Sequence, residues 1–336
     1  MIENVKVLCN LDAASGDEKS VRDYIISQIK DYCEFKIDNL GNIIAFKKGK
    51  KTPIRKIMLD AHMDEVGLII TSITKEGFLK FQTVGGIDVA ALMSRRVLIN
   101  GNLNGVISGK PIHLIGKDER KKLPKCENLY IDIGAVSKLE AESVVMLGDR
   151  AVICGEPQDT QDKIVSKAID DRAGCAILID LLQNYDEYDF YASFSVQEEV
   201  GLRGAKVSTY AINPDCAVIL ESTTAADIAD VAEDKTVCKL GYGPCVSFMD
   251  RGTVYDREFY KSALESGISC QPKCAVAGGN NSGAVHLTRE GVRCIAISIP
   301  CRYIHSASSV CDTEDIKNAR KLAEYMLNGI ASGEIK

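Results

Sequence analysis

The sequence predicts an α/β protein in which one sheet domain is interrupted by an all-β insertion. From about residue 164 onward, short apolar strands alternate with amphipathic helices, which is typical of an α/β sheet. Between residues 67 and 163, short β-like runs are separated by Gly and Asn turns, a pattern typical of a small barrel or sandwich. Together these two patterns indicate two domains, one inserted into the other.

The first segment, residues 1–66, contains elements of the same kind as the C-terminal part. Apolar residues at helical spacing predict a helix over 18–33, and Ser15-Gly16-Asp17 supplies start signals just ahead of it. Because 1–66 cannot form a core alone, we assign 1–66 and 164–336 to one domain. Its N-terminal strands are expected at 42–46 (NIIAF) and 57–61 (IMLDA).

The insertion, 67–163, lacks helical periodicity except over KLEAESVVM at 138–146. Its expected strands are GLIITSI, FLKFQTV, RRVLI, NGVIS, IHLI, NLYIDI and RAVIC. In the C-terminal part we expect helices at 171–184, 203–211, 257–266 and 313–330, and strands at 191–197, 216–221 and 294–300. The last helix has a continuous apolar face, so it should pack on the sheet.

Composition excludes several classes of protein. The 336 residues carry a net charge of −6, and no apolar stretch approaches the roughly 18–20 residues that span a membrane. The densest basic run, KDERKKLPK at 117–125, is interrupted by acids and reads as a solvated loop, so we expect no nucleic-acid partner. The N-terminus lacks the basic and apolar regions of a secretory signal.

Cysteine is frequent but shows no metal or disulfide pattern. The 13 cysteines are scattered without a CxxC pair, and the nearest two, Cys270 and Cys274, have no second pair beside them. We therefore interpret them as small apolar residues in a reducing compartment, and expect a cytoplasmic protein.

Several chemically active side chains follow the expected strands, where open α/β sheets bind their ligands. They are His62 and Asp64 after IMLDA, Glu198 and Glu199 after YASFSVQ, Glu221 at the end of CAVILE, His305 after CIAISIP, and Asp170-Asp171 before the helix at 171–184. Crowded carboxylates repel one another, and divalent cations relieve that repulsion. Histidine and carboxylate ligands without cysteine suit zinc, manganese or cobalt.

Each piece also has a simpler interpretation. Asp170-Asp171 could be only a helix N-cap doublet, Glu198-Glu199 a solvated surface pair, and His305 a structural histidine. The conjunction of all of them at one sheet edge favours a metal site. His113 and His286 lie outside this group and are interpreted as a barrel residue and a helix-packing residue.

Ordered blocks of the chain resemble the di-metal aminopeptidases of the glutamyl, deblocking and tetrahedral aminopeptidase family, some members of which carry an older endoglucanase label. The blocks cover nearly the whole chain and are LDAHMDEVGLII, VGGIDVAAL, LYIDIGA, KAIDDRAGCA, SVQEEVGLRGA, GAVHLTREGV and ISIPCRYIHS. The resemblance implies a zinc-peptidase-like α/β/α domain and two divalent metal ions per subunit, zinc or cobalt, with manganese also possible.

The resemblance also implies a role for each residue. Asp170 would bridge the two metals, with His62 and Glu221 completing one site and Glu199 and His305 the other. Glu198 would be the general base, and Asp64 would orient His62. At Glu221 the family has an aspartate, so this chain keeps the acid with one more methylene. At Asn280-Asn281-Ser282 the family has Thr-Asp-Ala, so this substrate-pocket loop lacks a carboxylate.

The expected function is therefore a metal-dependent aminopeptidase that removes N-terminal residues from peptides. Two alternatives remain open, an N-acyl amino acid deacylase with the same chemistry and an impaired paralogue that serves as a peptide-binding or assembly subunit. An endoglucanase would not explain His62 and His305, and the chain has no Trp for sugar stacking. In the family the β insertion joins subunits into dimers and then a dodecamer, so we expect a homo-oligomer.

Overall fold

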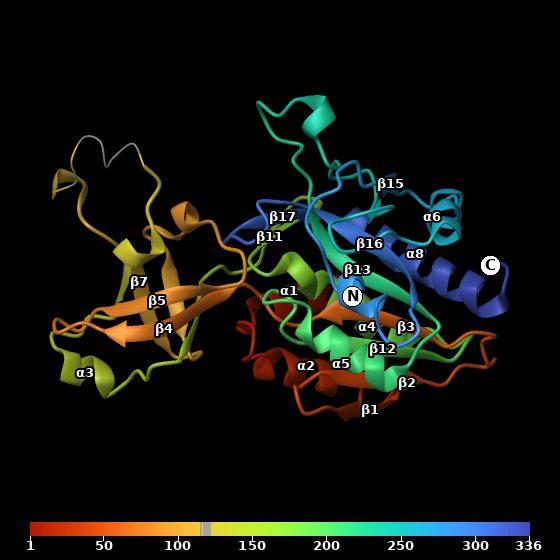
Figure 1. Ribbon diagram of the computed structural model, residues 1–336, viewed down its shortest axis with the longest axis horizontal. Coiled ribbons are helices and arrows are strands. Elements are labelled where there is room, and N and C mark those ends of the chain that lie inside the picture. The colour runs from red at the N-terminus through yellow and green to blue at the C-terminus, as the bar shows by residue number, and fades with distance from the viewer. Residues whose placement is uncertain (115, 117–121) are drawn as a thin grey trace.

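The computed structural model describes residues 1–114, 116 and 122–336. Most of the basic run at 117–125 therefore lies outside the described residues. In the described part of the chain, no helix is both long and apolar enough to cross a membrane. Figure 1 shows two bodies, a large sheet covered by helices and a smaller barrel beside it.

The large sheet has parallel strands at its centre. Strand order is β1-β2-β12-β3-β13-β16-β17-β11-β10, and β12, β3, β13 and β16 run parallel to one another. The remaining pairs are antiparallel, apart from β14 with β15 at one side. The strands are β1 (Glu34–Ile37), β2 (Ile43–Lys47), β3 (Ile57–His62), β10 (Gln158–Thr160), β11 (Lys163–Ser166), β12 (Phe190–Ser195), β13 (Cys216–Thr224), β14 (Cys245–Val246), β15 (Gln271–Pro272), β16 (Arg293–Arg302) and β17 (Ser309–Asp312).

Helices cover both faces of this sheet, which confirms the predicted three-layer α/β/α arrangement. Leu59 and Ala61 of β3 pack in the core with α1, α2, α4, α6 and α8, whereas Met58 points to the opposite core with α5 and α7. This alternation follows from the two-residue period of a strand. The helices are α1 (Ile2–Asn10), α2 (Lys19–Ile29), α4 (Ile169–Asn184), α5 (Arg203–Ile212), α6 (Arg257–Leu264), α7 (Ser282–Val285) and α8 (Thr313–Ser332).

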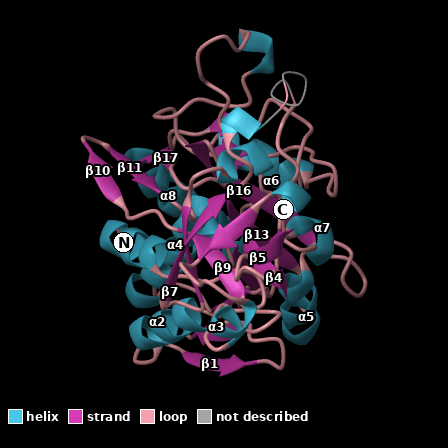
Figure 2. Ribbon diagram, turned by 90° about the vertical axis from the view of Figure 1, so that its left-hand side faces the viewer, coloured by secondary structure: helices cyan, strands magenta, loops and turns pink. Residues whose placement is uncertain are grey.

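The insertion forms the predicted barrel, closed in the order β4-β5-β8-β7-β6-β9 around its own apolar core. Closure satisfies the backbone groups that an open sheet would leave at its edges. Its elements are β4 (Gly67–Ile73), β5 (Leu79–Val84), β6 (Arg96–Ile99), β7 (Leu103–Ser108), β8 (Tyr130–Asp132), α3 (Lys138–Glu142) and β9 (Arg150–Ile153). Strand β10 lies within the range 67–163 but pairs with β11 of the large sheet, and Figure 2 shows these two beside β17.

Several sequence expectations were wrong in detail. Residues Ile112–Leu114 of the expected strand IHLI instead form a 3₁₀ turn, and Ile115 lies outside the described residues. Leu114 N donates to Pro111 O, and proline favours the first turn of a helix. Ser15-Gly16-Asp17 does not cap α2, which begins after Glu18. Strand β13 continues three residues beyond Glu221, so this glutamate lies within the strand rather than at its end.

Candidate metal centre

The candidate side chains converge where the parallel strands end. His62 is the last residue of β3, Glu198 and Glu199 follow β12, and Glu221 lies on the neighbouring β13. Asp170 lies at the start of α4, and His305 lies in the loop between β16 and β17. A cleft of about 300 Å³ is lined by five of these residues, Asp170, Glu198, Glu199, Glu221 and His305.

Asp170 lies between the two histidines. Its Oδ1 is 3.3 Å from His62 Nε2, and its Oδ2 is 3.2 Å from His305 Nε2. Each histidine also faces one glutamate, because Glu221 Oε1 is 3.4 Å from His62 Nε2 and Glu199 Oε1 is 3.2 Å from His305 Nε2. The result is two groups of three ligand-type side chains that share Asp170.

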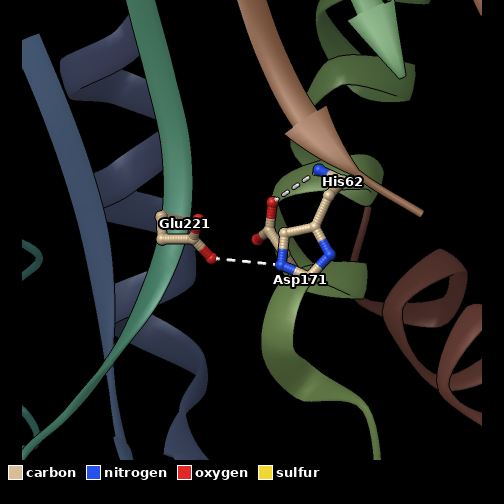
Figure 3. A group of neighbouring side chains, drawn as sticks. All are labelled: His62, Asp171 and Glu221. Atoms are coloured by element: carbon tan, nitrogen blue, oxygen red, sulfur yellow. Dashed lines mark hydrogen bonds and ion pairs between the residues drawn. The ribbon is translucent and has the colours of Figure 1, made fainter. Parts of the chain in front are cut away.

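The neighbouring Asp171 accepts hydrogen bonds from the backbone, and Figure 3 shows the one from His62 N. Its Oδ1 accepts from Gly174 N (3.0 Å) and its Oδ2 accepts from His62 N (3.3 Å). Asp171 therefore caps α4 and holds the end of β3. It also lies near His62 and Glu221, but both of its oxygens already accept backbone N–H groups. Asp171 thus fits the N-cap interpretation of the doublet, and Asp170 is the candidate metal ligand.

Asp64 fixes the orientation of several groups at once. Its carboxylate accepts from Glu198 N (3.0 Å), Glu199 N (3.2 Å) and Ser15 Oγ (2.6 Å). His62 Nδ1 lies 3.1 Å from Asp64 O and 3.4 Å from Asp64 Oδ1, so it faces acceptors only. If a cation bound here, Nδ1 would keep its proton for these acceptors, and Nε2, which faces Asp170 and Glu221, would be the ligand nitrogen.

His305 is oriented in the same way by the insertion. Its Nδ1 donates to Gly86 O at 2.8 Å, and Gly86 follows β5 of the barrel. Nε2 then points to Asp170 and Glu199. The sequence does not predict that Gly86 or Ser15 contacts the candidate metal centre, although Ser15 belongs to the expected helix start signal. Their blocks, VGGID and ASGD, carry turn signals but nothing that specifies their partner.

Burial and mutual repulsion set the electrostatics of the cluster. Burial and the charge of Asp170 raise the pKa of Glu221 well above its usual range, and burial raises the pKa of Glu199 although His305 opposes this. Burial would also raise the pKa of Asp170, but its close pairing with the His305 and His62 rings holds the pKa below its usual value. The same pairing outweighs burial at His305 and raises its pKa to about 11.

The donor set fits divalent cations. Asp170 Oδ1, Glu199 Oε1 and Glu221 Oε2 are buried and accept no hydrogen bond in the described part of the chain. Orphaned buried carboxylate oxygens are costly, and a cation satisfies several of them at once. Glu221 reaches His62 in spite of its extra methylene, so the longer acid fits the site.

The two asparagines of the 277–286 segment lie in different places. Asn280 lines the cleft, and its Nδ2 donates to Tyr255 Oη at 2.9 Å. Asn281 is buried beneath the site, where its Nδ2 donates to Asp60 Oδ2 (2.7 Å) and Ser195 Oγ (2.9 Å). The segment itself has no carboxylate at 280–282, but Asp60 of β3 places one beside Asn281. His113 and His286 lie apart from the cluster, in the 3₁₀ turn and at the end of α7.

Comparison with known proteins identifies the family of the chain. The model of the M42 glutamyl aminopeptidase family matches residues 41–322. The chain belongs to this family. Membership supports an aminopeptidase activity and makes the chain a peptide hydrolase, as the sequence predicts.

Similar M42 relatives span almost the whole chain. A putative aminopeptidase of Acetivibrio thermocellus is 38% identical over 96% of this chain and 97% of its own length. The lysyl aminopeptidase of Pyrococcus furiosus is 32% identical (97% and 96% covered), and the glutamyl aminopeptidase of Lactococcus lactis is 29% identical (100% and 98% covered).

Solved structures of M42 relatives confirm the fold. The TET aminopeptidase of a marine sediment Thaumarchaeota archaeon superposes with a TM-score of 0.94, at 32% identity over 99% of this chain and 97% of the other. The TET1 peptidase of Pyrococcus horikoshii, described as assembling into a tetrahedron or a large octahedral shell, gives 0.85 at 33% identity, covering 97% and 98%.

Proposed function

We propose that the protein is a dinuclear metal-dependent aminopeptidase. The observation that supports this best is the position of Asp170 between His62 and His305, with one glutamate beside each histidine. His62, Asp170 and Glu221 would hold one cation, and His305, Asp170 and Glu199 the other. Two divalent cations bound there, zinc, cobalt or manganese, would supply Lewis acidity that acidifies water and polarises the scissile carbonyl.

Glu198 belongs to neither ligand group and lines the same cleft, so we assign it the role of general base. Burial, with the charges of Glu199 and Asp170, raises the pKa of Glu198 to about 8. Two bound cations would lower this pKa, so that the carboxylate could accept a proton from water near neutral pH. Glu198 takes a proton from the attacking water and then passes it to the leaving amine.

The position of Glu198 depends on Asp64. Asp64 accepts hydrogen bonds from the backbone N–H groups of Glu198 and Glu199. One buried carboxylate therefore positions both the proposed base and a proposed ligand. The free α-amino group of a peptide would bind one of the two cations or a nearby carboxylate, which favours attack at the first peptide bond. Removal of single N-terminal residues follows from this arrangement.

Hydrolysis of a panel of aminoacyl anilides and short peptides tests the function. We expect release of free N-terminal amino acids, with loss of activity in chelator and recovery on adding zinc or cobalt. Cleavage of N-acyl amino acids but not of free-amine peptides would instead favour the deacylase. Binding of peptides without hydrolysis in the metal-loaded protein would favour an impaired assembly subunit.

We further propose that the insertion, 67–163, is an assembly domain and that 1–66 and 164–336 form the catalytic domain. Large apolar side chains are exposed on α3 and the segments beside it, among them Val136 (83%), Leu139 (81%), Met146 (71%) and Leu147 (62%). Exposed apolar patches of this kind mark interaction surfaces. We expect a homo-oligomer of dimers, with a dodecamer as the largest form. Elution from gel filtration as a monomer would contradict this.

We propose a cytoplasmic location as well. All thirteen cysteines are free, and the β16–β17 pair places Cys301 opposite Cys311 without a disulfide. Free thiols in such number suit a reducing compartment.

A further inference from the structure

Among the described residues, a lysine lines the cleft beside the carboxylates of the candidate metal centre. Lys273 follows the short strand β15 and shares the cleft with Glu198 and Asn280. Lys273 is only 8% exposed, which is unusual for a lysine. Sequence reasoning missed it, because it lies in an irregular segment between β15 and α7 with no recognisable motif.

Among the residues that the structure describes, Lys273 has no ionic partner. Its Nζ donates to Ala277 O at 3.3 Å, and Ala277 is itself a cleft residue. Within the part of the chain that the structure describes, no carboxylate lies within 4.0 Å of this Nζ. A buried charge that lacks a counter-ion is costly, so a persistent ammonium here needs an anion or water from the cleft.

The carboxylates of the candidate ligand groups cannot serve as that anion. Asp170, Glu199 and Glu221 face the histidines and would be neutralised by two cations. Uncharged residues also line the cleft, among them Ala277, whose carbonyl Lys273 contacts, and Val237, Ala275, Gly278, Thr223 and Thr224. A loaded site therefore leaves the Lys273 part of the cleft positively charged.

The relatives do not decide what this part of the cleft binds. At similar identity, one is named for lysyl substrates and another for glutamyl substrates, which carry opposite charges. The preference of this chain has to follow from its own residues.

We propose that Lys273 binds the side-chain carboxylate of the substrate's N-terminal residue, so that the enzyme prefers acidic N-terminal residues. This proposal rests on the proposed aminopeptidase function. Because Asp170, Glu198 and Lys273 line one cleft, a side chain attached beside the scissile bond would extend toward the ammonium. A charge-assisted hydrogen bond formed there would replace the missing partner of Lys273.

The wild-type, metal-loaded enzyme gives the first test, through kcat/KM for glutamyl, aspartyl, leucyl and lysyl p-nitroanilides. We expect the acidic substrates to exceed leucyl, and leucyl to exceed lysyl. Leucyl hydrolysis without an acidic preference would overturn the assignment of Lys273 while leaving the aminopeptidase function intact. No hydrolysis of any anilide or peptide would instead overturn the proposed function on which this assignment rests.

Lys273→Met should lower kcat/KM for the acidic anilides by roughly 10- to 100-fold and leave leucyl hydrolysis nearly unchanged, because one charge-assisted bond is lost. Lys273→Arg should retain the preference, and Lys273→Glu should shift it toward lysyl. Lys235→Met, at a lysine whose side chain is 76% exposed, is the matched control and should change nothing.

Leucyl activity and metal content of each variant report whether it is folded, so a loss confined to acidic substrates is specific. A dipeptide and its C-terminal amide provide the last comparison. If Lys273→Met impaired only the free dipeptide, the lysine would bind a C-terminal carboxylate, and the proposal would be wrong. An equal loss on all substrates would also contradict it.

Discussion

Glu198 is the residue on which the proposed chemistry depends most. Glu198→Gln keeps the size of the side chain but cannot accept a proton, so we expect kcat to fall by roughly 10²- to 10⁴-fold. Neither ligand group includes Glu198, so the variant should keep its bound cations, measured by elemental analysis. Full activity of Glu198→Gln would remove Glu198 as the base. Loss of cations would make it a ligand instead.

Glu18 gives a pH-dependent test of how the base is positioned. Its Oε1 accepts from Gly16 N (2.6 Å) and Gln197 N (3.1 Å), and Gln197 immediately precedes Glu198. Burial, with the charge of Asp64, raises the pKa of Glu18 from 4.5 to about 7. The folded protein therefore holds the proton more tightly than the unfolded chain, and stability from this group is lost as pH rises from 4.5 through 7.

Glu18→Gln removes this ionisation and keeps an acceptor. The melting temperature of the variant relative to wild type should therefore rise between pH 5 and pH 8. The exposed Glu76→Gln is the control, and its difference from wild type should stay constant across this range. A pH-independent difference for Glu18→Gln would show that burial of the Glu18 charge does not limit stability.

For single residues, the sequence predicts which side chains form the site better than it predicts which atoms they contact. Strand ends and local patterns were enough to place His62, Asp170, Glu198, Glu199 and His305 at one sheet edge. They could not predict that Asp171 caps α4 and holds His62 N, since Asp170 and Asp171 are chemically identical. The division of work between them follows from backbone angles that no side-chain pattern records.

Among the elements, the segment before α7 explains the departure from the family's Thr-Asp-Ala. Asn281 donates to Asp60 Oδ2, and Ser195 Oγ also lies beside that oxygen at 3.3 Å. Burial raises the pKa of Asp60 to about 6, opposed by its hydrogen bonds to Ser193 and Asn281. An amide at 281 thus complements a carboxylate at 60, and the segment is anchored to β3.

Asn281→Asp should place two buried carboxylates at hydrogen-bond distance and lower the free energy of unfolding by about 2–4 kcal/mol. Adding Asp60→Asn restores one amide and one acid, and should recover most of the loss. Denaturant unfolding of the two single variants and the double variant measures this coupling. Additive effects of the two changes would show that the pair does not anchor the segment.

The elements that the sequence missed have weak local signals. Helix α1 buries Val5, Leu8 and Cys9, and a cysteine in an apolar face obscures its periodicity. Strand β1 is fully exposed, so it lacks the alternation that reveals a half-buried strand. Strand β17 is short and follows the His305 loop directly, and its place in the sheet depends on pairing with β11 and β16.

For the whole molecule, the nested arrangement was predictable because the two parts differ in period. The barrel runs and the α/β alternation are both legible in the sequence. The contact between them was not, since Gly86 O of the barrel segment and His305 Nδ1 are 219 residues apart. This hydrogen bond joins the insertion to the candidate metal centre, so the barrel supports the site as well as any assembly.

The number of cations bound per chain tests the central claim most directly. After equilibration with zinc or cobalt and removal of free metal, we expect elemental analysis to give two per chain in the wild type. We expect about one in His305→Ala, with hydrolysis of aminoacyl anilides lost together with the second cation. Two cations retained by His305→Ala, or full hydrolysis by protein stripped of metal, would contradict a dinuclear centre shared through Asp170.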